Sequence, residues 1–285
     1  MSNDGRTERG HPRGTGSTRA ADRWQRGYDK AGAGRAGRLV RVAAKALVVQ
    51  NTARGGPGRF GDWLAEAGVA VEIVRAYEGG PLPSRLTQDA LVVLGGGFMP
   101  DDDSHAPWLA PTRALAAQAL EAGTPFLGIC LGGQLLAHVA GGQVAAQHGE
   151  PEIGSTPLTL RPVAGSDPLF HGLPARVTAI ERHVDAITAL PPGAVWLAES
   201  EHCPYQAFRV GERAWGVQFH PETDPDRIRT WDPRRLAEHG LDRAELLRRA
   251  TEDGATATPV WQRLAARFAA LAQQSARSAG RRGCD

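Results

Sequence analysis

Short apolar runs of β-prone residues alternate with helical stretches through the first half of this 285-residue chain. The expected strands are 46–50, 69–74, 90–94 and 125–129. The expected helices among them are 59–67, 111–122 and 131–140, each ending at a glycine. Strands that are apolar throughout are typical of a sheet with both faces covered, and glycine is the usual residue after a helix. The alternation predicts an α/β fold, a mostly parallel sheet flanked by helices, with ligand sites at the carboxyl ends of the strands.

The second half of the chain has the pattern of strands joined by turns, with helices after them. The expected strands, which extend or cap the same sheet, are 156–161, 176–181, 194–198, 205–210 and 214–219. The expected helices are 233–250 and 258–271. The last helix is predicted to begin at Thr258, a good N-cap residue, with Pro259 at its first helical position.

Four parts are expected along the chain. They are a disordered basic tail at 1–38, an α/β domain at 39–232, a helical extension at 233–272 and a second disordered tail at 273–285. The first tail has nine basic and four acidic residues and few apolar ones, so it cannot offset the entropy cost of ordering. A solvated extension is favoured over a nucleic-acid-binding arm.

Charge, hydropathy and cysteine content exclude several classes of protein. A formal net charge of +2 is too balanced to make nucleic acid the default partner. No run approaches the roughly 18–20 apolar residues of a membrane span, and the N-terminus lacks the apolar segment of a secretory signal. Cys130, Cys203 and Cys284 are odd in number, far apart and without a CxxC pair. We expect a cytoplasmic protein with no nucleic-acid or membrane partner, no metal and no other cofactor.

Cys130 lies where a predicted buried strand runs straight into a predicted helix. Gly128 and Gly132 flank it at two residues on either side, as a sharp strand-to-helix turn requires. A helix N-terminus also favours a thiolate, because free amide N–H groups stabilise negative charge. The pattern indicates a nucleophile; the alternative is a buried structural cysteine, which is the interpretation we favour for Cys203 before Pro204.

A base for this nucleophile is offered by His220, which follows the predicted strand 214–219. Glu222 lies two residues further on, so both side chains can project from the same side of an extended chain. A carboxylate on one ring nitrogen would fix the tautomer of His220 and leave the other nitrogen for the thiol. Alone, the His-x-Glu pattern is equally compatible with a surface turn.

Gly95, Gly96 and Gly97 follow the predicted strand 90–94 directly. Glycines there let the backbone approach a substrate, so an oxyanion hole can form from the N–H groups of Gly96 and of Leu131, the residue after the nucleophile. A dinucleotide-binding loop is the competing interpretation. It fails because the spacing is not GxGxxG and no helix follows immediately.

Together these motifs resemble the class I glutamine amidotransferase family, and most of all its stand-alone GMP-synthase-like members. The resemblance is carried by Leu94-Gly95-Gly96, Gly128-Ile-Cys130-Leu-Gly-Gly-Gln134, Glu152-Ile-Gly154, Gln206-Ala-Phe-Arg209 and Gly216-Val-Gln-Phe-His220-Pro-Glu222. It implies a flavodoxin-like core and hydrolysis of L-glutamine through a γ-glutamyl thioester. The implied catalytic residues are Cys130, His220 and Glu222. The implied oxyanion hole is Gly96 with Leu131, and the implied substrate-binding residues are Gln134 and His183.

Departures from the family pattern leave other functions open. Gly97 stands where many relatives have proline, and Arg182-His183-Val184-Asp185 where relatives often have an aromatic-His-Gly-Asp run. No synthetase domain follows Glu222, so we expect the ammonia acceptor on a separate synthetase chain. The alternatives are a hydrolase of γ-glutamyl amines or peptides, and a non-catalytic regulatory domain. A zinc site of Cys130, His183 and His220 is disfavoured because its members lack short local spacing.

Overall fold

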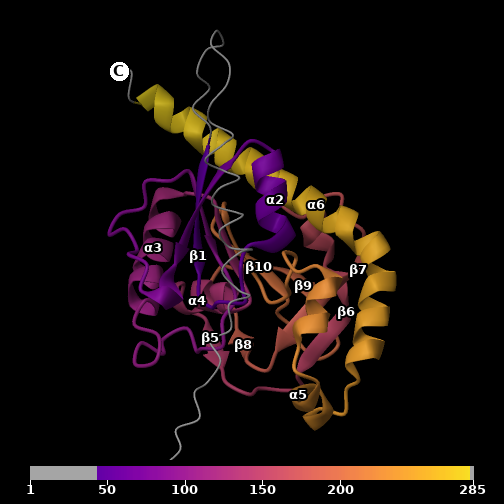
Figure 1. The fold of residues 1–285 in the computed structure, drawn as a ribbon. Coiled ribbons are helices and arrows are strands. Elements are labelled where there is room, and N and C mark those ends of the chain that lie inside the picture. The colour runs from indigo at the N-terminus through magenta and orange to yellow at the C-terminus, as the bar shows by residue number, and fades with distance from the viewer. Residues whose placement is uncertain (1–43, 283–285) are drawn as a thin grey trace, which may run out of the picture. The chain divides into compact units, whose positions relative to one another are not determined.

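The computed structural model describes residues 44–282, and within them one nine-stranded sheet forms the centre of the fold (Figure 1). Its strand order is β2-β1-β3-β4-β11-β10-β9-β6-β7. The first five strands are parallel: β2 (Ala70–Arg75), β1 (Lys45–Gln50), β3 (Ala90–Val93), β4 (Phe126–Ile129) and β11 (Ala214–Val217). The predicted α/β class with a mostly parallel sheet is therefore confirmed. The expected tail at 1–38 and residue Cys284 lie outside the described residues.

The strands of the second half extend this sheet with antiparallel pairs. They are β10 (Ala207–Val210), β9 (Val195–Glu199), β6 (Glu152–Leu160) and β7 (Arg176–His183). A separate pair joins β5 (Gln143–Ala145) to β8 (Ala186–Ala189). Within the described residues, three short 3-10 helices complete the connections: η1 (Ala76–Glu78), η2 (Pro162–Ser166) and η3 (Pro225–Thr230). Of the two arrangements open to the sequence, extension of the sheet is the one observed.

Helices cover the two faces of the parallel strands. On one face, α3 (Leu109–Ala122) and α4 (Leu131–Val139) pack on alternate residues such as Leu47, Val49 and Val93. On the other face, α2 (Gly58–Glu66) packs against α6 (Arg243–Arg282), with the rings of Phe60 and Phe268 6.2 Å apart (Figure 1). None of the helices within 44–282 is long and apolar enough to cross a bilayer.

The C-terminal helices differ from the prediction in three ways. The expected helix 233–250 is interrupted, because α5 (Pro233–Glu238) ends before Gly240, whose φ of +69° suits glycine. The predicted start at Thr258 and Pro259 is wrong, since α6 runs through Pro259 without a break. The predicted disordered tail at 273–285 is wrong as far as residue 282, where α6 ends.

Tertiary contacts explain the length of α6. The Thr258 hydroxyl accepts a hydrogen bond from Arg59 Nη1 at 3.0 Å instead of capping a helix. Beyond Pro259, the side chain of Trp261 is fully buried, and Gln273 Nε2 donates to the Ala67 carbonyl at 2.7 Å. Packing and hydrogen bonds to α2 therefore outweigh the loss of one backbone hydrogen bond at a proline.

Trp261 links α6 to the strand end that leads into the predicted site. Its ring lies 4.6 Å from that of Phe219, and its Nε1 donates to the Thr178 carbonyl at 3.1 Å. We expect Trp261→Ala to lower the free energy of unfolding by about 3–5 kcal/mol, because it leaves a large cavity and an unpaired carbonyl. Urea denaturation measures this. Gln262→Ala, at an exposed position of the same helix, should change it by about 0.5 kcal/mol or less; equal losses would contradict the assignment.

Candidate functional site

The predicted site residues other than His183 meet at the carboxyl ends of neighbouring parallel strands. Strands β4 and β11 run side by side with Ile129 opposite Val217, and the N–H of Cys130 donates to the Val217 carbonyl at 2.7 Å. The residues that follow β4 and β11 in the chain therefore lie together at one edge of the sheet. Because β11 is the fifth parallel strand in space but the eleventh in the chain, this meeting depends on a long-range pairing.

Cys130 forms a sharp turn between β4 and α4. Its φ of +53° and ψ of −110° are rare for a residue with a side chain, and the residue is 7% exposed. The turn is tight enough that a Cβ on Gly128 would overlap the Gly132 carbonyl, and one on Gly132 would overlap the Val93 carbonyl. The two glycines that the sequence singled out are therefore required by close backbone approach.

His220 and Glu222 form a hydrogen-bonded pair next to this cysteine. His220 Nδ1 lies 2.7 Å from Glu222 Oε1, and the His220 N–H donates to the Ile180 carbonyl at 2.8 Å. Burial by itself lowers the pKa of His220, but the Glu222 carboxylate and Cys130 outweigh it and raise that pKa well above its ordinary value. The pair thus supplies a basic imidazole with Nδ1 engaged by a carboxylate.

The glycine loop after β3 lies directly against these groups. A Cβ on Gly95 would be 3.0 Å from His220 Cε1 and 3.5 Å from Cys130 Cβ, so Gly95 touches both residues. A Cβ on Gly96 would be 2.7 Å from the Leu131 side chain. The loop is fixed by Asn51, whose Nδ2 donates to the Leu94 carbonyl at 2.7 Å. Gly96 and Leu131 are therefore neighbours, and the N–H of Leu131, in the first turn of α4, has no partner within its own helix.

Gln134 lies in the first turns of α4 and is 2% exposed. Its Nε2 donates to the Asp185 carbonyl at 3.2 Å and to Gln218 Oε1 at 3.0 Å. Gln218 Nε2 in turn donates to Cys130 Sγ at 3.5 Å. Gln218 is not among the predicted site residues, although it belongs to the same motif as His220; only the fold shows that it touches the sulfur.

His183 lies in a second buried polar cluster. It is the last residue of β7, and its Nε2 is 3.1 Å from Glu152 Oε2 and 3.6 Å from Glu181 Oε2. Ser200 Oγ and Gln206 Nε2 also donate to Glu152 Oε2, at 2.9 and 2.6 Å. No local pattern points to Glu181, because its burial depends on strands distant in the chain.

This second cluster contains carboxyl groups in contrasting states. Burial opposes ionisation of Glu152, but hydrogen bonds from His183, Ser200 and Gln206 lower the pKa of Glu152. Glu181 is fully buried, both its oxygens lack a hydrogen-bond partner within residues 44–282, and burial, with the nearby Glu152 charge, raises its pKa well above the ordinary value. Burial also raises the pKa of the Cys203 thiol.

Cys203, His183 and Glu152 have ligand-type atoms within 4.8 Å of one another, so within residues 44–282 they form a group that could hold a metal ion. The disfavoured zinc set of Cys130, His183 and His220 is a different one. Two Cys/His/Glu constellations therefore exist, and they differ at the cysteine. Cys130 stands at a tight helix N-terminus, whereas Cys203 is 1% exposed with a raised pKa.

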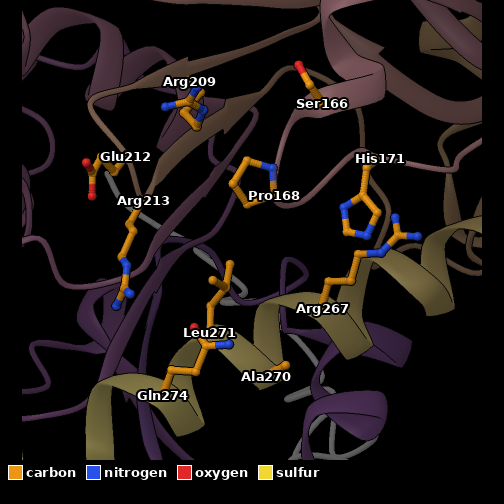
Figure 2. Close-up of a pocket in the computed structure, with 10 residues that line it drawn as sticks. All are labelled: Ser166, Pro168, His171, Arg209, Glu212, Arg213, Arg267, Ala270, Leu271 and Gln274. Atoms are coloured by element: carbon orange, nitrogen blue, oxygen red, sulfur yellow. The ribbon is translucent and has the colours of Figure 1, made fainter. Parts of the chain in front are cut away.

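A separate cleft of about 680 Å³ lies away from these clusters (Figure 2). Its lining includes Arg213, Arg267 and Leu271. Arg213 precedes Ala214, the residue of β11 opposite the first residue of β4, so the cleft lies at the amino ends of the strands. None of the predicted site residues lines it.

Comparison with known proteins identifies relatives of this chain. The sequence model of the family described as "Glutamine amidotransferase class-I" matches residues 62–231, more than half of the chain. The GMP synthase [glutamine-hydrolyzing] of Porphyromonas gingivalis is 40% identical over 147 residues, which are 51% of this chain and 27% of that protein. The corresponding enzyme of Thermomicrobium roseum is 43% identical over 131 residues, 46% of this chain and 23% of that protein. The matched part thus spans about a quarter of these relatives.

Solved structures give the same family over most of the chain. A glutamine amidotransferase from Thermotoga maritima superposes with a TM-score of 0.72 at 25% identity, covering 80% of this chain and 98% of that one. A glutamine amido transferase from Methylobacillus flagellatus superposes with a TM-score of 0.70 at 29% identity, covering 79% and 93%. The predicted flavodoxin-like arrangement is confirmed by these neighbours.

The turn at Cys130 generates a test of the glycine requirement. We expect Gly132→Ala to destabilise the protein by about 1–3 kcal/mol or more, because the new methyl group overlaps the Val93 carbonyl. Gly97→Ala is the matched control, since a Cβ at exposed Gly97 meets nothing within 4 Å. Thermal or urea unfolding compares the two, and a Gly132→Ala protein as stable as Gly97→Ala would refute the tight turn.

The raised pKa of Glu181 predicts a pH dependence of stability. Above the ordinary pKa of glutamate the unfolded chain releases a proton that the folded protein retains, so wild-type stability falls as pH rises toward the folded pKa. Glu181→Gln cannot ionise and lacks this fall. We expect the free energy of unfolding of the variant to increase relative to that of wild type between pH 5 and 8, by up to about 1.4 kcal/mol per pH unit.

Urea denaturation at pH 5, 6, 7 and 8 measures this difference. Glu201→Gln, which removes an exposed carboxylate, is the control. Parallel curves for wild type and Glu181→Gln would show that Glu181 is ionised in the folded protein.

Proposed function

Because this chain belongs to the class I glutamine amidotransferase family, we propose that it hydrolyses the side-chain amide of L-glutamine through a thioester on Cys130. The observation that carries the proposal is the meeting, at one edge of the sheet, of a cysteine at a helix N-terminus with a carboxylate-bound imidazole. These groups are what nucleophilic attack on an amide requires.

In the first half of the reaction, the Cys130 thiolate attacks the amide carbon of glutamine. The carbonyl π electrons move to oxygen, and the N–H groups of Gly96 and Leu131 stabilise that negative charge. His220, holding the proton taken from the thiol, passes it to the departing nitrogen as the C–N bond breaks. Ammonia leaves, and a γ-glutamyl thioester with Cys130 remains.

In the second half, water attacks the thioester carbon. His220 removes a proton from that water, the same two N–H groups stabilise the second oxyanion, and the C–S bond breaks to release glutamate and the thiolate. Glu222 accepts a hydrogen bond from Nδ1 of His220, which directs Nε2 to the sulfur and stabilises the imidazolium. Its role is electrostatic and orienting.

Cys203, His183 and Glu152 are the weaker candidates for this chemistry. The Cys203 thiol is 1% exposed, so a substrate has little access to it. Its pKa is raised, so little of it is present as the reactive thiolate. Glu152 Oε2 already accepts hydrogen bonds from Ser200 and Gln206. We assign Cys203 and Glu152 to support of the sheet, whereas His183 keeps its predicted role in substrate binding.

We further propose that the ammonia is used by a separate synthetase chain. The relatives matched in sequence are named GMP synthase [glutamine-hydrolyzing], and the match covers about a quarter of their length. These names support a synthetase as the user of the ammonia. Gln134 and His183 stay predicted as substrate-binding residues.

The decisive assay is ammonia and glutamate release from L-glutamine. We expect Cys130→Ala to lower kcat by about 10⁴-fold or more, because the covalent route is lost, whereas Cys203→Ala keeps activity within about tenfold. His220→Ala should match Cys130→Ala in its loss. Activity that survives Cys130→Ala and disappears with Cys203→Ala would show that Cys203 is the nucleophile.

Lack of glutamine turnover by wild type, alone and with cell extract, would contradict glutamine as substrate. A panel of γ-glutamyl amines and peptides is then the next assay, since the same nucleophile cleaves any γ-glutamyl amide.

A further inference from the structure

Gln218 is a buried polar side chain that the reaction described above does not use. It follows β11 directly, is 1% exposed, and its backbone N–H donates to the Gln206 carbonyl at 2.9 Å. Its side chain lies between Gln134 and Cys130, with Nε2 3.5 Å from the sulfur. A buried amide of this kind is costly unless its hydrogen bonds are made, so the partners of each end matter.

The hydrogen-bond network determines which end of the Gln218 amide faces the sulfur. The Asp185 carbonyl can only accept, so the group of Gln134 at 3.2 Å from it is the NH₂ group. The second hydrogen of that NH₂ group points to Gln218, 3.0 Å away, which must therefore present its oxygen. The Gln218 NH₂ group is left facing Cys130 Sγ.

We propose that Gln218 is a catalytic residue that donates an N–H hydrogen bond to the Cys130 thiolate, and that Gln134 positions it. The proposal rests on the proposed function, because it names a further group at the same sulfur. No proton is transferred from Gln218: the thiol proton goes to His220, and the amide N–H stabilises the charge that remains on sulfur.

The hydrogen bond is strongest at two points of the cycle. It acts on the free thiolate before attack, and again when the thiolate leaves the second tetrahedral intermediate. In the thioester between them the sulfur is neutral and a weak acceptor. A donor to the leaving thiolate thus favours release of glutamate, and a donor to the free thiolate stabilises the form of Cys130 that attacks.

Alkylation of Cys130 by iodoacetamide tests the proposal directly, with the modified peptide quantified by mass spectrometry between pH 6 and 9. We expect Gln218→Leu to slow alkylation at pH 7 about tenfold and to shift the rate profile toward higher pH, because a charge-assisted donor is lost. Gln218→Glu should slow it further, because it places a negative charge beside the sulfur. Gln206→Leu, which removes a neighbouring buried glutamine that does not touch the sulfur, is the matched control.

The positioning role of Gln134 has its own readout. In Gln134→Leu the side-chain amide of Gln218 is free to rotate, so we expect Cys130 to be alkylated more slowly than in wild type. The double variant Gln134→Leu/Gln218→Leu should be alkylated no more slowly than Gln218→Leu alone. Additive losses would separate the two residues and overturn the positioning role. Circular dichroism and urea unfolding select variants that remain folded.

An unchanged alkylation profile in folded Gln218→Leu would overturn the catalytic role and leave Gln218 as a packing residue. The same conclusion follows if Gln206→Leu shifts the profile equally. Because alkylation needs no glutamine, this result is independent of the assay for the proposed function: wild type can fail to hydrolyse glutamine and still show the Gln218-dependent profile.

Discussion

The close contact between the β4–α4 turn and strand β3 is the constraint on which the site depends. Cys130 can adopt its positive φ because the residues two positions before and after it are glycines: Gly132 lies against the Val93 carbonyl, and Gly128 against Gly132 itself. This turn aims the sulfur at the sheet edge and starts α4 with free N–H groups beside it. A larger residue at either glycine would push the helix away from the strands.

The second requirement is the pairing of β11 with β4. That pairing places Gln218 and His220 beside Cys130, and α6 secures it from outside through the contact of Trp261 with Phe219. Residues far apart in the chain thereby become neighbours within a few ångströms. The long terminal helix is thus part of the structure that supports the site, although it contributes no group to the chemistry.

Local signals were sufficient for the strands and helices of the first half and for the cysteine turn, because apolar periodicity and paired glycines act within a few residues. They failed in α6. Thr258 and Pro259 have the local chemistry of a helix start, yet the bond from Arg59 and the burial of Trp261 hold the helix continuous. Tertiary contacts outweighed local preference there, as they commonly do where a helix has a fully buried face.

By itself the sequence determined the fold class, the sharp turn at Cys130 and the His220–Glu222 pair, since each depends on spacing along a single strand or helix start. Only the tertiary structure decided which polar side chains share an environment. It separated His183, which joins Glu152 and the buried Glu181, from His220 at the sulfur. It also turned Gln134 toward Gln218. These contacts join residues from different strands, whose side-chain partners are set by sheet order and register rather than by distance along the chain.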